Sequence, residues 1–322
     1  MRMDRRIRLL GRILGRTSIA TRSDEEIVAF QQRGVPRNRL TEWLSGTLAA
    51  GVMTKDITVA GAEGDLPARV YRPRRSAGEL PLVVFYHGGG WMTGDLDSYD
   101  WVTSHVAARA DVVVVSVAYR LAPTHRWPVA AEDAYAACVD VVARAGEWAA
   151  DGRRVAVAGD SAGGNLSAVV TLMARDRGGP PITFQGLIYP ATDLTAAIDE
   201  NDVLANAPIL PQRDRLAYGT AYIPNSEDRR HPHASPALAA DHTGLPPALV
   251  QVAEHDPLRE DGLRYADILR AAGVPVRTTD YVGMPHGFLS FPNVCRSAPQ
   301  AVAELSDQLR EHLHGAAKAM GA

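Results

Sequence analysis

The chain has 322 residues, with 34 basic and 37 acidic side chains and a net charge of −3. This near balance excludes the strongly basic face that a nucleic-acid groove requires, and it fits a small partner molecule of little charge. The two cysteines, Cys138 and Cys295, lie far apart and outside any metal-binding spacing. We therefore expect reduced thiols, a cytoplasmic location, and neither a metal nor a cofactor.

The first fifty residues predict short helices and loops. Between Met1 and Arg16, six arginines alternate with apolar residues at helical spacing, namely Ile7, Leu10, Ile13 and Leu14. The apolar stretches are too short for a secretory signal or a membrane span. A basic amphipathic helix can make weak contact with a membrane surface. We expect instead a lid helix whose apolar stripe packs on the rest of the protein.

Strand-like runs begin after these helices. Residues 57–60 and 68–71 predict a short antiparallel pair that opens a sheet. The continuous apolar runs at 82–86 and 112–118 are typical of parallel strands covered by helices on both faces. Residues 99–110 between them predict a helix.

The alternation of helices and strands continues to the C-terminus. The predicted elements are a helix at 129–145, a strand at 154–158, a helix at 164–175, strands at 184–189 and 248–253, a helix at 259–272, a strand at 276–282 and a helix at 300–313. Repeated βα units predict an α/β fold with a mostly parallel, doubly wound sheet of eight strands. Residues 191–242 interrupt this pattern with five prolines, and a long insertion of this kind is typical of a lid.

One short motif lies between the strand at 154–158 and the helix at 164–175. It reads Gly159-Asp160-Ser161-Ala162-Gly163. A serine on a sharp strand-to-helix turn presents its hydroxyl at the edge of the sheet, and the flanking glycines relieve the strained turn. A glycine-rich turn without chemistry is the alternative. Partners for Ser161 decide whether it is a nucleophile.

A serine nucleophile needs a base and a carboxylate that orients the base. His286 follows the strand at 276–282, and Asp256 follows the strand at 248–253. Both therefore lie at the carboxyl edge of the sheet, where ligands bind in open α/β folds. Glu254 and Asp261 compete for the carboxylate role, but Pro257 turns the chain directly after Asp256 and favours that residue.

A glycine-rich loop follows the strand at 82–86 and reads His87-Gly88-Gly89-Gly90-Trp91. Its backbone N–H groups can approach a substrate without a Cβ in the way, so the loop and the N–H of Ala162 are candidates for an oxyanion hole. A phosphate site is less favoured, because no Gly-Lys-Ser or Gly-Lys-Thr follows. We expect His87 to brace the loop rather than to transfer protons.

Apolar residues beside these motifs are candidate walls of a substrate pocket. Packing in the core is an equal alternative for each of them. The candidates are Trp91, Tyr189, Ile209, Leu210, Phe288 and Leu289.

With these motifs, residues 80–290 closely resemble the bacterial hormone-sensitive-lipase-like esterases of the α/β-hydrolase superfamily. Five motifs in order carry the resemblance: His87 to Trp91, Tyr119-Arg120-Leu121-Ala122-Pro123, Gly159 to Leu166, Asp256-Pro257-Leu258-Arg259, and His286-Gly287-Phe288. One position departs from the pattern, because Thr124 stands where the family commonly carries Glu.

The resemblance implies a role for each motif. Ser161, Asp256 and His286 would form a catalytic triad, and the N–H groups of Gly89, Gly90 and Ala162 would form the oxyanion hole. Residues 51–190 and 243–322 would be the catalytic domain. The N-terminal segment, 1–50, and the insertion, 191–242, would form a cap.

From residues and resemblance together we expect a serine carboxylesterase for short- to medium-chain acyl esters. An amidase or peptidase, a long-chain lipase, and a non-catalytic small-molecule receptor on the same fold remain alternatives. The sequence leaves the natural ester, the stereochemical preference and the oligomeric state open, a homodimer among them.

Overall fold

A computed structural model describes residues 3–15, 18–34, 36, 38–196 and 203–319. Its centre is one eight-stranded sheet in the order β1-β2-β4-β3-β5-β6-β7-β8. β1 and β2 run antiparallel, β2 pairs antiparallel with β4, and every later pairing is parallel. The strands are β1 (Val52–Gly61), β2 (Gly64–Pro73), β3 (Leu80–Tyr86), β4 (Val113–Val117), β5 (Ala150–Asp160), β6 (Ile182–Ile188), β7 (Ala248–His255) and β8 (Val276–Pro285). The predicted α/β fold class is confirmed.

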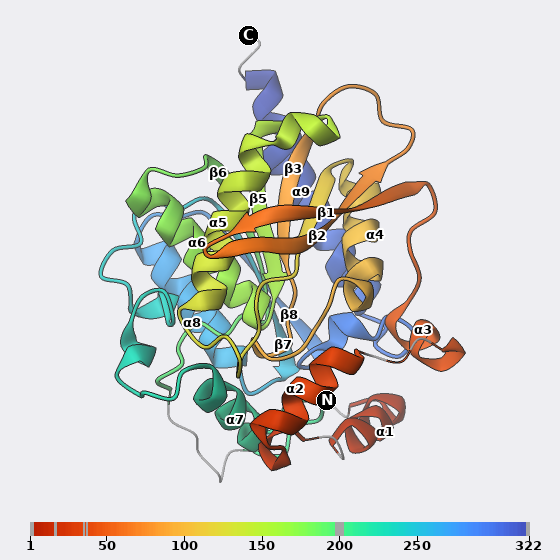
Figure 1. The fold of residues 1–322 in the computed structure, drawn as a ribbon, viewed down its shortest axis with the longest axis vertical. Coiled ribbons are helices and arrows are strands. Elements are labelled where there is room, and N and C mark those ends of the chain that lie inside the picture. The colour runs from red at the N-terminus through yellow and green to blue at the C-terminus, as the bar shows by residue number, and fades with distance from the viewer. Residues whose placement is uncertain (1–2, 16–17, 35, 37, 197–202, 320–322) are drawn as a thin grey trace.

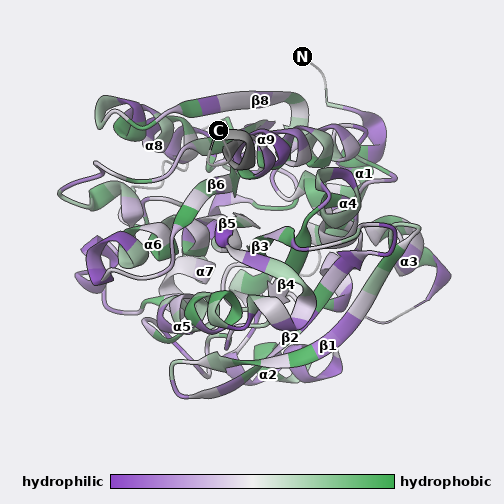
Figure 2. Ribbon diagram, turned by 90° about the horizontal axis from the view of Figure 1, so that it is seen from above, coloured by the Kyte–Doolittle hydropathy of each residue, from purple (hydrophilic) through white to green (hydrophobic). Residues whose placement is uncertain are grey.

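Helices cover both faces of this sheet. α5 (Val129–Ala143), α6 (Ala162–Arg177) and α8 (Arg259–Ala271) lie on one face, and α4 (Asp100–Ala110) and α9 (Ala298–Ala319) lie on the other (Figure 2). Because successive side chains of a strand point to opposite faces, each central strand supplies two cores. In β3, for example, Val84 belongs to the cluster under α5 and α6, and Phe85 to the cluster under α4 and α9.

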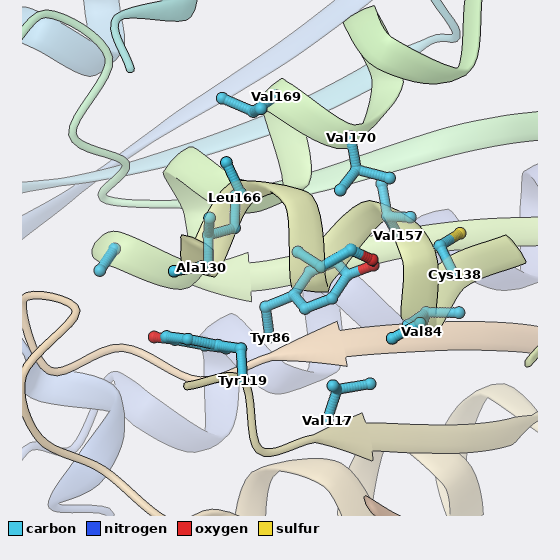
Figure 3. Packing of buried hydrophobic residues seen from close by; sticks show 14 of the residues in the cluster. Val84, Tyr86, Val117, Tyr119, Ala130, Cys138, Val157, Leu166, Val169 and Val170 are labelled. Carbon is cyan, nitrogen blue, oxygen red and sulfur yellow. The ribbon is translucent and has the colours of Figure 1, made fainter. Parts of the chain in front are cut away.

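The core under α5 and α6 is tightly packed around Tyr86. Figure 3 shows this side chain among valines of β3, β4 and β5 and the apolar faces of the two helices. Its hydroxyl group donates a hydrogen bond to the carbonyl oxygen of Ala134 in α5, at 2.8 Å. Burial of each large side chain here contributes about 2 kcal/mol. Cys138 lies in this core, and both cysteines are buried free thiols.

The N-terminal helices lie together at one end of the sheet. They are α1 (Arg5–Leu14), α2 (Asp24–Arg33) and α3 (Arg39–Ser45), and α7 (Gln212–Tyr222) of the insertion lies beside them (Figure 1). The hydroxyl group of Ser18 donates a hydrogen bond to a carboxylate oxygen of Asp214 in α7. The N-terminal segment and the insertion are therefore joined, although almost two hundred residues separate them in the chain.

The apolar stripe of α1 is narrower than the sequence predicts. Ile7 and Leu10 are buried in the core under α4 and α9, and Leu14 packs against that core. Ile13 is 54% exposed, so its predicted burial is wrong. With 3.6 residues per turn, Ile13 falls on the same side as Leu9, away from the buried face. None of the helices within the described ranges is long and apolar enough to cross a membrane.

Several element ends differ from the predicted ones. β1 and β2 are ten residues each rather than four, because charged side chains such as Lys55, Asp56 and Asp65 lie in these strands outside the short apolar runs that predict them. The helix predicted at 129–145 ends at Ala143, where a 3-10 turn over Ala145–Trp148 replaces it. α2 and α3 end at Gly34 and Gly46, which have φ of 62° and 81°.

The close contact between β3 and α6 at Gly163 allows a test of the packing. A Cβ atom on Gly163 would lie 1.9 Å from the carbonyl oxygen of Tyr86. We expect Gly163→Ala to lower the free energy of unfolding by about 3 kcal/mol, measured by denaturant titration, because two backbones would have to separate. The matched control is Gly219→Ala in α7, where a Cβ meets nothing within 4 Å; helix propensity predicts a gain of about 1 kcal/mol there. Equal stability of Gly163→Ala and the wild type would contradict the packing argument.

Candidate active site

Ser161 lies on the turn between β5 and α6. Its φ of 53° and ψ of −117° form a sharp, unfavourable turn that no regular element contains. The turn is held from both sides: the Ser161 N–H donates to the carbonyl of Ile188 in β6 at 2.8 Å, and neither Gly159 nor Gly163 leaves room for a side chain. The serine hydroxyl is therefore fixed at the carboxyl edge of the sheet.

Three predicted side chains meet at this edge. Ser161 Oγ lies 2.8 Å from His286 Nε2, and His286 Nδ1 lies 2.7 Å from Asp256 Oδ2. His286 follows β8 directly and Asp256 follows β7, so parallel neighbouring strands deliver both residues. The geometry fits an imidazole whose Nδ1–H donates to the carboxylate and whose Nε2 accepts the serine proton.

The structure separates Asp256 from its two competitors. Asp256 is fully buried, and its second oxygen accepts a hydrogen bond from the N–H of Leu258 at 2.8 Å. Glu254 instead accepts from the N–H of Gly283. Asp261, in α8, faces Arg215 of α7 at 3.5 Å and Arg264 at 3.4 Å. Only the Asp256 carboxylate contacts His286 among these three.

The glycine loop after β3 supplies candidate donors. Gly89 and Gly90 have φ of 113° and 61°, a backbone conformation that side chains disfavour. The N–H groups of Gly89, Gly90 and Ala162 have no acceptor among the described residues. Ala162 is also the first residue of α6, where the helix dipole favours negative charge. Three unpaired donors of this kind suit a developing oxyanion.

His87 braces the loop through its ring. The imidazole is buried, stacks on Tyr119 with ring centroids 4.4 Å apart, and has Nδ1 at 2.8 Å from the carbonyl oxygen of Gly88. Burial lowers the pKa of His87. A neutral, fully packed imidazole is a structural support rather than a proton carrier. Thr124, the position that departs from the family pattern, is exposed at the surface.

Sequence reasoning missed the contacts of the buried residue next to Ser161. Asp160, beside the nucleophile, is buried and accepts hydrogen bonds from the N–H of Gly88 at 2.9 Å and from the hydroxyls of Tyr99 and Tyr189 at 3.1 Å each. Burial raises its pKa to about 6, and the tyrosine hydrogen bonds and His286 oppose that rise. The acidic residue inside the serine motif was the available signal, but its partners lie far away in the sequence.

The predicted pocket residues lie in different surroundings. Tyr189, Phe288 and Leu289 are buried in the core beneath His286, and the Tyr189 ring centroid is 4.8 Å from that of His286. Trp91 stacks on Tyr222 of α7, and Leu210 is buried in the same cluster. Ile209 is half-buried and lies against Gly287, next to the imidazole. Contact of these six side chains with a substrate stays a prediction.

The fold and this cluster of side chains define a hydrolase of the nucleophile-elbow class. The family described as alpha/beta hydrolase fold matches residues 83–290. The chain belongs to this α/β-hydrolase family, and its predicted resemblance to hormone-sensitive-lipase-like esterases is confirmed.

Known relatives agree with this assignment. A carboxylesterase of Mycobacterium tuberculosis, NlhH, is 45% identical over 78% of this chain and 79% of its own. An ethyl acetate hydrolase of Pseudomonas putida is 32% identical over 80% of this chain and 82% of its own. The solved structure of a hyperthermophilic esterase from the archaeon Pyrobaculum calidifontis superposes with a TM-score of 0.85 at 36% identity, covering 97% of this chain and 99% of the other.

The raised pKa of Asp160 predicts a pH-dependent stability. Its folded pKa of about 6 exceeds the ordinary value of 3.8, so the folded state prefers the protonated carboxyl. The resulting stability is present below pH 3.8 and is lost as the pH rises through 6. The difference between the two pKa values corresponds to a change of about 3 kcal/mol in the free energy of unfolding.

The neutral variant Asp160→Asn provides the reference. We measure the free energy of unfolding by guanidinium titration and subtract the value of Asp160→Asn from that of the wild type. We expect this difference to fall by about 3 kcal/mol as the pH rises from below 3.8 to above 6. The exposed control Asp65→Asn, at the second residue of β2, should show a flat difference. A flat difference for Asp160→Asn as well would refute the raised pKa.

Proposed function

We propose that this protein is a serine carboxylesterase that cleaves small acyl esters through an acyl-enzyme intermediate. The observation that carries the proposal is the continuous chain of short contacts from Ser161 through His286 to Asp256, at 2.8 and 2.7 Å. The class of ester hydrolase is that of its relatives, which are named carboxylesterases and esterases. The catalytic residues and the range of acyl groups are our inference.

In the first half-reaction, the three residues of the triad activate the serine hydroxyl together. His286 Nε2 takes the proton from Ser161 as Oγ attacks the ester carbonyl carbon, and Asp256 stabilises the imidazolium that forms. The oxyanion accepts hydrogen bonds from the N–H groups of Gly89, Gly90 and Ala162, each of which lowers the barrier by about 3 kcal/mol. Collapse of the intermediate breaks the ester C–O bond, and His286 returns its proton to the departing alcohol.

The second half-reaction repeats these steps with water. His286 removes a proton from a water molecule, the oxygen attacks the acyl-enzyme, and the same donors stabilise the second oxyanion. The bond to Ser161 Oγ then breaks, and His286 reprotonates the serine. The free acid leaves and the starting state is restored.

The cap is proposed from the contacts between its two parts. We assign residues 51–190 and 243–322 to the catalytic domain, and 1–50 and 191–242 to the cap. The buried hydrogen bond from Ser18 to Asp214 supports this division, because it joins the two cap segments to each other. α7 is the longest described helix of the insertion, with eleven residues, and it is polar on average. The described residues of the cap form no long apolar helix, which favours short and medium acyl chains over a long-chain lipase substrate.

A panel of p-nitrophenyl esters of increasing acyl length tests the function. We expect the highest kcat/KM for short to medium chains and a steep fall for long ones, measured by release of p-nitrophenolate. Matched anilides separate the amidase alternative, which requires a preference for the amide. The proposal would be refuted if the protein hydrolysed none of the esters in the panel.

Two variants assign the catalytic roles in the same assay. Ser161→Ala should abolish turnover and labelling by a serine-directed phosphonate. Asp256→Asn should lower kcat by about 10⁴-fold, because the imidazole loses its orienting carboxylate. Glu254→Gln is the matched control, since that carboxylate contacts Gly283 rather than His286. Near-full activity of Asp256→Asn would remove Asp256 from the triad.

Two features support a proposal for the location of the enzyme in the cell: its buried thiols and the outer face of α1. Two buried free cysteines favour the reducing cytoplasm, where we place the enzyme. The outer face of α1 exposes Leu9 and Ile13, one helical turn apart, with Arg8 and Arg12 beside them. An exposed apolar pair flanked by arginines suits the surface of an anionic membrane, so we propose that α1 makes weak contact there.

Flotation with vesicles of equal parts phosphatidylcholine and phosphatidylglycerol tests this contact. Replacing Arg8 and Arg12 by Gln should weaken binding about 30-fold, because each arginine near an anionic surface contributes about 1 kcal/mol. Arg153 and Arg277, exposed elsewhere, provide the control pair. Equal binding of the two double variants, or no flotation of the wild type, would exclude the contact.

A further inference from the structure

The glycine loop after β3 is held in an unfavourable conformation. Gly89, Gly90 and Trp91 have φ of 113°, 61° and 59° in succession. For Trp91, which has a Cβ, such a φ is uncommon and strained. A strained stretch of this kind persists only when surrounding groups hold it in place. The groups that hold this loop therefore control where its N–H donors lie.

One of those groups comes from the N-terminal helices. Gln31 in α2 donates from Nε2 to the carbonyl oxygen of Met92 and to that of Ala122, at 2.7 Å each. Ala122 in turn donates its N–H to the carbonyl of Trp91 at 2.9 Å. A single side-chain amide thus joins the loop to the neighbouring segment that ends in Pro123.

These contacts reach the candidate oxyanion donors through one turn. The N–H groups of Met92 and Thr93 both donate to the carbonyl oxygen of Gly89, at 3.1 and 2.9 Å. The Met92 carbonyl shares a peptide group with the Thr93 N–H, and the Gly89 carbonyl shares one with the Gly90 N–H. Holding the Met92 carbonyl therefore orients the Gly90 N–H directly and the Gly89 N–H through the adjoining Cα. Met92 and Ala122 are completely buried, so water has little access to replace the amide of Gln31.

The position of Gln31 is itself defined by packing. Ile27 lies one turn earlier on α2 and is buried in the cluster that contains Trp91 and Met92. A capping box at Ser23 fixes the start of the helix. Residues four apart share one helix face, so α2 presents an apolar anchor and an amide donor to the same loop.

We propose that Gln31 is a positioning residue that holds the N–H groups of Gly89 and Gly90 in the orientation that receives the oxyanion. This role rests on the proposed ester hydrolysis. Negative charge on the carbonyl oxygen develops only in the transition state, so misplaced donors weaken transition-state binding more than substrate binding. Loss of Gln31 therefore lowers kcat and leaves KM nearly unchanged.

The test replaces Gln31 by Met, which keeps the length of the side chain and removes both donors. We expect kcat for ethyl and butyl esters to fall at least tenfold with KM within about twofold of the wild type. Affinity for a trifluoromethyl ketone, which forms a tetrahedral adduct with the serine, should fall by the same factor as kcat/KM. The matched control is Gln32→Met, the same change at the next, exposed position of α2.

A second variant separates positioning from folding. Gln31→Lys keeps N–H donors at a similar distance and should recover most of the lost kcat, whereas thermal unfolding of both variants reports stability alone. Gln31→Ala replaces Gln31→Met where the latter does not fold. A kcat equal to that of Gln32→Met, or a loss confined to KM or to thermal stability, would overturn the role of Gln31. A wild type without Ser161-dependent hydrolysis would overturn the proposed function and this role together.

Discussion

The buried carboxylate of Asp160 joins the parts of the site that the chain supplies separately. It ends β5 beside the nucleophile, and it accepts hydrogen bonds from Gly88 of the glycine loop and from Tyr189 after β6. The sheet brings the end of β5, the glycine loop and the segment after β6 close together, and these hydrogen bonds fix the three segments to one another. A charged group is costly to bury, and the hydrogen bonds from Gly88, Tyr99 and Tyr189 compensate for only part of its lost hydration. The turn at Ser161 depends on this support, because its backbone is unfavourable by itself.

Sequence reasoning was sufficient for the sheet and for the meeting point of three side chains. Continuous apolar runs identify the buried parallel strands, and parallel strands must end at one edge. Ser161, Asp256 and His286 each follow such a strand, so topology places them at one edge of the sheet. The turns after β7 and β8 then bring Asp256 and His286 across to Ser161. The start of β5 was not predictable in this way, because Arg153 and Arg154, which pair with the buried Asp151, interrupt the apolar pattern of the strand.

Long-range polar contacts were beyond the reach of the sequence. Asp160 and Gln31 look like ordinary solvated residues until their partners are known, and those partners lie 61 to 91 residues away for Gln31. Apolar neighbours of the motifs were ambiguous for a similar reason. Phe288 and Ile209 are both large and apolar, yet one is fully buried under the site and the other is half-buried beside it. Residue type alone does not distinguish a side chain that lines a substrate pocket from one that packs in the core.

The contact between the insertion and the glycine loop limits how this enzyme can be recombined with its relatives. A Cβ on Gly90 would lie 2.2 Å from the ring of Tyr218 in α7, so the loop and the insertion fit each other as a pair. Exchanging the proposed cap segments for those of a relative would therefore change the groups that hold the loop. A functional chimera would need residue 90, residue 218 and the helix that carries Gln31 to be transferred as one unit.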